Sequence, residues 1–136
     1  MTATTSTNRS TSVANDGLLR FAMRLDAVLS GVMGVAGLAL APRMAELSGT
    51  TATVEYSLAV FLVAYGVVVY GLSSMRHLRM PGIAVVAGNV LYTVGAVAVV
   101  LAGVWPLTTF GVVLTLGSGV YTLVMADLQY LGLRRL

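Results

Sequence analysis

The sequence contains no cysteine and no lysine, and His77 is its only histidine. Without cysteine the chain offers no disulfide, no thiolate nucleophile and no cysteine-ligated zinc or iron–sulfur site. Its five acidic residues and one histidine are not clustered at the spacing of metal ligands. We therefore expect no metal site and no other cofactor.

Charge of either sign is also scarce. Charged residues make up 10% of the 136 residues and hydrophobic residues 57%, whereas about 25% of the residues in soluble domains are charged. A soluble protein of this size consists mostly of surface and could not cover it with so few charges. The composition excludes an intrinsically disordered chain as well, and it predicts a polytopic membrane protein.

The sequence motifs of common catalytic sites are missing. There is no G-x-x-x-x-G-K-[ST] phosphate loop, no H-E-x-x-H zinc motif and no G-x-G-x-x-G dinucleotide fingerprint. No serine is accompanied by the histidine and aspartate that would activate it as a nucleophile. We therefore expect no enzyme activity.

Four hydrophobic segments follow a Thr/Ser-rich start. Residues 1–16 show no apolar period, which predicts a disordered tail. The segments cover about residues 18–41, 56–72, 83–104 and 107–133. Each is close to the ~20 residues that a helix needs to cross about 30 Å of hydrocarbon, and none alternates with the period of a strand. The sequence predicts an all-α fold, with residues 17–136 forming an antiparallel bundle of four transmembrane helices.

The prolines predict where some of these helices begin and end. Proline removes a backbone N–H and is tolerated best in the first turn of a helix. We therefore expect the first helix to end before Pro42, with a separate helical turn over residues 44–47. Pro81 is expected to open the third helix, and Pro106 to lie in the first turn of the fourth.

The arginines predict the orientation of the bundle. Seven of the eight fall on the side that holds both termini and the loop between the second and third segments. Because short cytoplasmic loops are enriched in arginine, we expect both termini in the cytoplasm and the chain in a bacterial cytoplasmic membrane. Trp105 then belongs to the aromatic belt of the outer interface. The residues assigned as headgroup and topology anchors are Arg20, Arg24, Arg76, Arg79, Arg134 and Arg135.

The dispersal of the arginines also bears on partners. They are interleaved with apolar spans instead of forming one basic patch. This pattern favours contact with the lipid bilayer and predicts no binding of nucleic acid.

Small residues form stripes on the predicted helices. Lipid chains are as apolar as leucine, so helices in a bilayer associate through close contact between small residues. These stripes can pack the helices of one bundle, or they can dock another membrane subunit or a second copy of the chain. The residues assigned to such faces are Ser30, Gly31, Gly34, Gly37, Gly88 and Gly95.

A few polar side chains interrupt the hydrophobic segments. On antiparallel helices they lie at one depth, in the cytoplasmic third of the membrane. The expected cluster consists of Asp26, Tyr65, Tyr70, Asn89, Tyr92 and Asp127. A carboxylate near the bilayer centre costs about 2.5–3.5 kcal/mol on insertion scales and less near the interface. The two aspartates are therefore hydrogen-bonding groups between helices, a site for a proton, a cation or a lipid headgroup, or water-exposed groups at the helix termini.

Two stretches of sequence indicate a family. They are residues 24–34 (RLDAVLSGVMG) in the first segment and residues 87–92 (AGNVLY) in the third. With these stretches, and with arginine in place of lysine, the chain resembles small four-helix integral membrane proteins of actinobacteria over about residues 18–135. The resemblance implies a four-helix fold, and because those proteins have no assigned activity it implies no site residues.

The sequence predicts two functions of different classes. The first is an accessory or scaffold subunit of a larger complex of the cytoplasmic membrane, such as a lipid transporter or a respiratory assembly. Small size, little mass outside the membrane and the stripes of small residues favour it. The second is a small transporter coupled to a proton or a cation, with Asp26 and Asp127 as its carboxylates.

Overall fold

A computed structural model describes residues 15–136 of the chain. In this part of the chain all regular elements are α-helices, and no strand occurs. The helices are α2 (Gly17–Ser48), α3 (Ala52–Ser73), α4 (Arg79–Ala102) and α5 (Thr109–Arg134). Each is long and apolar enough to cross a membrane, which confirms the all-α prediction. The predicted tail over residues 1–16 lies outside the described residues except for its last two.

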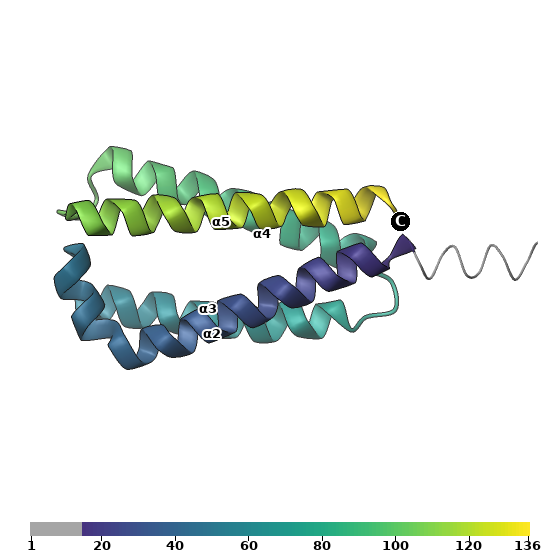
Figure 1. The fold of residues 1–136 in the computed structure, drawn as a ribbon, viewed down its shortest axis with the longest axis horizontal. Coiled ribbons are helices and arrows are strands. Elements are labelled where there is room, and N and C mark those ends of the chain that lie inside the picture. Colours follow the sequence, from purple (N-terminus) through teal and green to yellow (C-terminus); the bar gives the residue numbers. More distant parts are fainter. Residues whose placement is uncertain (1–14) are drawn as a thin grey trace, which may run out of the picture.

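The four helices form two hairpins that lie side by side (Figure 1). One hairpin consists of α2 and α3, and the other of α4 and α5. The C-terminus, the start of α2 and the loop from α3 to α4 lie together at what we call the terminal end. The hairpins meet at the terminal end and diverge toward the opposite end, which we call the far end (Figure 1).

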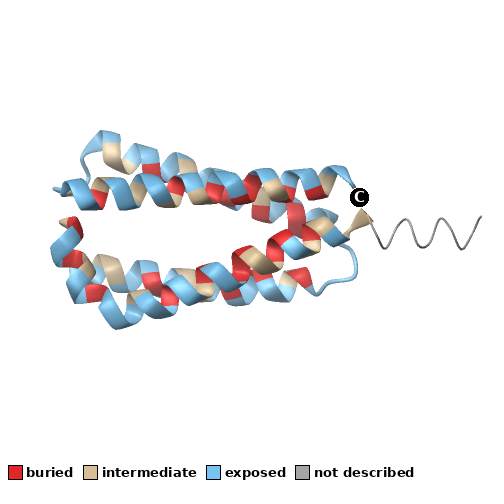
Figure 2. Ribbon diagram, viewed as in Figure 1, coloured by how far each residue is buried: buried red, intermediate tan, exposed pale blue. Residues whose placement is uncertain are grey.

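The hydrophobic core lies where the hairpins meet. Buried residues cluster in the half of the molecule nearer the terminal end (Figure 2). The core there is made of side chains from α2, α3, α4 and the loop before α4, namely Leu19, Met23, Ala27, Val69, Leu78 and Val85. The junction of the hairpins is therefore packed at this end and open beyond it.

Glycines allow the helices to approach closely at this core. A Cβ atom added at Gly132 of α5 would lie 2.6 Å from Cα of Leu19 in α2. A Cβ atom added at Gly66 of α3 would lie 2.6 Å from the carbonyl oxygen of Ala27. Because both obstacles are backbone atoms, these positions accept no larger residue without moving a helix.

The prediction that the first helix ends before Pro42 is wrong. Helix α2 continues through Pro42 to Ser48, and Gly49, with φ at 80°, caps it by donating its N–H to the carbonyl of Ala45. Proline in a helix removes one hydrogen bond, but the turns around Pro42 pack on the rest of the molecule, since Ala41, Ala45 and Ser48 are buried. The turn expected over residues 44–47 is thus part of α2, whose last turns bend toward the start of α5 (Figure 1).

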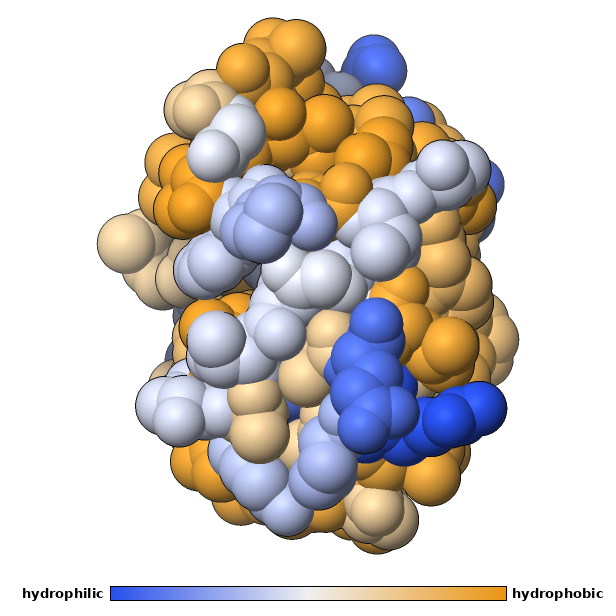
Figure 3. Space-filling model, turned by 90° about the vertical axis from the view of Figure 1, so that its left-hand side faces the viewer, coloured by the Kyte–Doolittle hydropathy of each residue, from blue (hydrophilic) through white to orange (hydrophobic). Residues whose placement is uncertain are grey.

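The hairpins touch again at the far end. Pro106 lies before α5 and not in its first turn, and Thr108 is the N-cap, because its hydroxyl accepts the backbone N–H of Gly111. The backbone N–H of Thr108 donates to the carbonyl of Ser48 at 3.0 Å, and its hydroxyl donates to the carbonyl of Leu47. At this end of the surface a weakly polar strip and a strongly hydrophilic patch beside it interrupt the apolar surroundings (Figure 3).

Candidate functional site

The carboxylate of Asp26 is fully buried where the two hairpins meet. It accepts five hydrogen bonds, and each of the four helices supplies at least one donor. The donors are Ser30, Tyr65, Asn89, Tyr121 and Gln129. Donor–acceptor distances run from 2.7 Å for the hydroxyl of Tyr65 to 3.2 Å for that of Ser30. We call these six residues the Asp26 network.

The two side-chain amides of the network also bind each other. Nδ2 of Asn89 donates to Oδ2 of Asp26 and to Oε1 of Gln129, both at 2.9 Å. Nε2 of Gln129 donates to Oδ2 of Asp26 at 3.0 Å. Both hydrogens of the Asn89 amide are thus used inside the network, so that α2, α4 and α5 are joined by one set of buried bonds.

No cationic side chain bonds the carboxylate of Asp26 in residues 15–136. All five donors are neutral hydroxyl or amide groups. The ion pairs found in residues 15–136 are Arg20–Asp16 and Arg43–Glu46. Neither involves Asp26, so the hairpin junction holds one uncompensated carboxylate.

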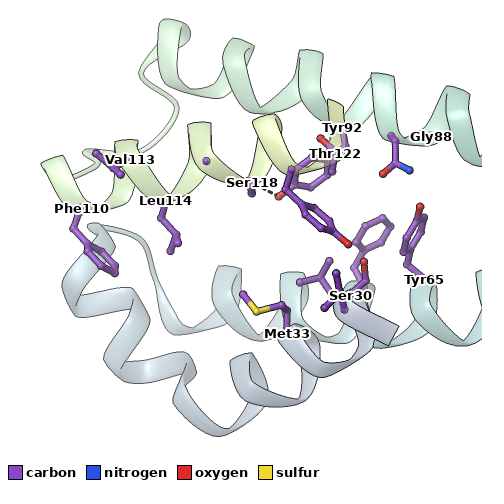
Figure 4. Close-up of a pocket in the computed structure, with 16 residues that line it drawn as sticks. Ser30, Met33, Tyr65, Gly88, Tyr92, Phe110, Val113, Leu114, Ser118 and Thr122 are labelled. Atoms are coloured by element: carbon purple, nitrogen blue, oxygen red, sulfur yellow. Dashed lines mark hydrogen bonds between the residues drawn. The ribbon is translucent and has the colours of Figure 1, made fainter. Parts of the chain in front are cut away.

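A cavity of about 660 Å³ lies between the hairpins next to this network. Side chains of all four helices line it, and most of them are aliphatic or aromatic. Four of the lining residues, Ser30, Tyr65, Asn89 and Tyr121, belong to the Asp26 network. Asp26 itself lies behind them. In the close-up, Tyr65 and Ser30 stand at one end of the cavity, with Phe110 and Leu114 toward the other (Figure 4).

A second space of about 470 Å³ continues toward the far end. It shares six lining residues with the first, namely Met33, Phe61, Leu62, Tyr92, Leu114 and Ser118. The two spaces are therefore parts of one elongated hairpin cavity. We call the part beside the Asp26 network the inner part and the remainder, which includes Trp105, the outer part.

The structure brings together three of the six polar residues that were expected to meet: Asp26, Tyr65 and Asn89. Tyr92 lines the cavity farther along, with its hydroxyl 3.0 Å from Oγ of Ser118. Tyr70 and Asp127 are exposed and lie outside the network.

Two members of the network, Tyr121 and Gln129, were not assigned from the sequence. The sequence does contain a signal for Gln129: its spacing from Thr122 and Met125 places all three residues on one face of a helix. In the structure this face of α5 is buried. Asp127 precedes Gln129 by two residues and therefore points about 200° away from it.

The small-residue stripes divide between two environments. Three of the assigned residues, Gly31, Gly34 and Gly37, lie against α3 inside the first hairpin. Ser30 belongs to the Asp26 network. Gly88 and Gly95 of α4 are exposed, have nothing within 4 Å of an added Cβ atom and border the hairpin cavity.

The assigned anchors also differ in their surroundings. Nε of Arg24 donates to the hydroxyl of Ser73 at 3.2 Å, and its guanidinium lies 5.6 Å from the centre of the Tyr70 ring. Arg20 bonds the carbonyl oxygens of Ser73 and Met75. Both arginines therefore tie α2 to the end of α3. The exposed arginines of the terminal end are Arg76, Arg79, Arg134 and Arg135.

Comparisons of the chain with models of protein families, with curated proteins and with solved structures found no match. Fold and site alone therefore define its class. Over residues 15–136 it is an all-α protein with four helices long enough to cross a membrane and a buried carboxylate at the inner end of an apolar cavity.

Proposed function

We propose that this chain is a multi-pass protein of the bacterial cytoplasmic membrane that binds a hydrophobic small molecule in the hairpin cavity. The observation that carries the proposal is the position of the Asp26 network at one end of a cavity of about 660 Å³. Ligand pockets have volumes of about 300–1,000 Å³ and are mostly apolar, with a few placed polar groups that orient the ligand. The inner part of the hairpin cavity has both properties.

Binding beside a buried carboxylate also agrees with part of the transporter predicted from the sequence. An ionisable residue inside a membrane protein is costly and usually faces its interior or a cavity. Asp26 fits that description, whereas Asp127 is exposed. We therefore retain Asp26 alone as the carboxylate of a small proton- or cation-coupled transporter.

The role of an accessory subunit stays a prediction, as does the resemblance to actinobacterial membrane proteins. A partner would need a free face of small residues. Gly88 and Gly95 are exposed, but both border the hairpin cavity, so they favour a ligand there as much as a partner helix.

Filling the hairpin cavity is expected to abolish binding. Leu114 of α5 lines both parts of the cavity, and Leu114→Trp would occupy the space with an indole. The full chain in lipid nanodiscs is dialysed against tetraphenylphosphonium, triphenylphosphine oxide and tetraphenylborate, with empty nanodiscs as reference. At least one probe should bind saturably to the wild type and at least tenfold more weakly to Leu114→Trp.

Leu116→Trp is the matched control, because Leu116 lies two residues away, is similarly exposed and does not line the cavity. Its affinities should equal those of the wild type. If no probe bound above the empty nanodiscs, or if both variants behaved alike, cavity binding would be refuted.

We further propose that the terminal end faces the cytoplasm, since the arginines gather there. The chain has no cysteine, so a single cysteine is a unique label site. Thr53→Cys and Val104→Cys, both exposed near the far end, should react with a membrane-impermeant maleimide in intact cells. The exposed Ser74→Cys should react only after lysis, and labelling in the reverse pattern would contradict this orientation.

A further inference from the structure

The inner part of the hairpin cavity offers a ligand no free hydrogen-bond donor from its side chains. The hydroxyls of Ser30, Tyr65 and Tyr121 donate to the carboxylate of Asp26. The amide of Asn89 uses both of its hydrogens inside the Asp26 network. These four lining residues therefore have no side-chain hydrogen left to donate to a ligand.

The remaining polar side chains of the inner part are committed in the same way. Oγ of Ser118 donates to the carbonyl of Thr115 at 2.7 Å, so the Tyr92 hydroxyl is the donor in its 3.0 Å bond to Ser118. The hydroxyl of Thr122 donates to the carbonyl of Gly119 at 2.9 Å. A ligand whose polar group only accepts hydrogen bonds, such as a ketone, an ester or a phosphine oxide, finds no partner among them.

Aromatic rings form much of the same wall. Phe61 and Tyr65 stack with ring centroids 6.2 Å apart, and Tyr92, Phe110 and Tyr121 line the cavity with them. The face of an aromatic ring is electronegative and attracts organic cations, which is how aromatic cages hold quaternary ammonium groups.

A single buried carboxyl group lies directly behind this wall. Asp26 bonds the hydroxyls of Tyr65 and Tyr121 and has no cationic partner in residues 15–136. In surroundings of low dielectric constant an ionised carboxylate acts strongly on a neighbouring charge. The walls, however, are too apolar to replace the water shell of a small inorganic cation, so the charge favours a cation that is itself hydrophobic.

We propose that the hairpin cavity binds a lipophilic organic monocation. Its charge lies against the rings of Tyr65 and Tyr121, beside the carboxylate of Asp26, and its apolar body extends toward Phe110 and Leu114. One positive charge balances the one carboxylate of the junction, and an anion of the same shape is repelled. This inference rests on the proposed ligand cavity and adds the chemical class of the ligand.

The same three probes test this class, because they are similar in shape and differ in charge. With the wild-type chain in nanodiscs, tetraphenylphosphonium should bind at least tenfold more tightly than triphenylphosphine oxide. Tetraphenylborate should show no saturable binding above empty nanodiscs. Trp105, the only tryptophan of the chain, lies in the wall of the outer part, so its fluorescence gives a second readout of occupancy.

Three variants connect the preference to the site. Asp26→Asn removes the charge and should weaken tetraphenylphosphonium binding at least tenfold, until it resembles that of the neutral probe. Phe61→Leu removes one ring and should weaken it about 2- to 30-fold. Asp127→Asn removes an exposed carboxylate and should leave it unchanged.

The order of affinities on the wild type decides the proposal even if Asp26→Asn fails to fold. Triphenylphosphine oxide binding as tightly as tetraphenylphosphonium would overturn the cation class and leave the proposed cavity standing. A cation preference that a folded Asp26→Asn retains would also overturn it. Absence of binding by all three probes would refute the proposed function and this inference with it.

Discussion

Asp26→Leu is expected to lower the free energy of unfolding by about 3 kcal/mol, because it leaves five buried or half-buried donors without their acceptor. Hydrogen bonds between membrane helices contribute about 0.6 kcal/mol each on average, and all five donors bind this one side chain. Leucine has the same branched side-chain skeleton as aspartate, so we expect loss of the bonds to dominate over loss of packing. The measurement is unfolding of the purified chain in mixed detergent micelles, followed by circular dichroism.

Asp127→Leu is the matched control for this prediction. Asp127 is exposed and outside the network, so we expect a change below about 0.5 kcal/mol, as is usual for surface substitutions. Asp26→Asn should lie between the two, because its remaining carbonyl oxygen still accepts some of the bonds. Equal stability of Asp26→Leu and the wild type would show that the network does not hold the hairpins together.

Gly34→Leu is expected to destabilise the first hairpin by about 1–3 kcal/mol, the usual cost of overpacking. A Cβ atom at position 34 would lie 2.8 Å from the carbonyl oxygen of Ala59 and 2.8 Å from the backbone nitrogen of Val63. Because backbone atoms cannot rotate away as a flexible side chain can, α2 and α3 must separate. The same unfolding experiment measures the loss.

Gly71→Leu provides the control on α3. Gly71 is exposed, and nothing lies within 4 Å of an added Cβ atom. Leucine also has a higher helix propensity than glycine, so this variant should be as stable as the wild type or slightly more stable. If Gly34→Leu and Gly71→Leu unfolded alike, the close approach of α2 and α3 at Gly34 would be disproved.

The architecture explains why these two substitutions act on different parts of the molecule. Gly34 lies inside one hairpin, where α2 and α3 pack directly on each other. Asp26 lies between the hairpins, which otherwise join through the core at the terminal end and through Thr108 at the far end. Loss of the Asp26 network should therefore loosen one hairpin relative to the other and change the hairpin cavity between these contacts.

Much of the helical structure follows from hydrophobic runs, but the helix ends do not. Pro42 was expected to end the first helix, yet α2 continues to Ser48. Its last turns gain hydrogen bonds to Thr108 of the other hairpin. That stabilisation comes from a residue about sixty positions away along the chain, and no local signal contains it.

The composition of the site was predicted in part for a similar reason. Asp26, Tyr65 and Asn89 were expected to meet because successive antiparallel crossings determine the depth of each residue. Which face of α5 turns inward is a separate question, because depth says nothing about rotation around the helix axis. The face with Gln129 turns inward and Asp127 remains exposed.

The sequence by itself therefore determined the class of fold, the long apolar helices of residues 15–136 and the meeting of Asp26, Tyr65 and Asn89. These properties depend on the length, composition and order of the hydrophobic segments. All of these features are local to the sequence. Only the tertiary structure decided the rotation of α5, where Gly132 packs on the backbone of Leu19 and brings Gln129 to Asp26. It also decided that the hairpins diverge and leave a cavity, because that space depends on contacts at both of its ends.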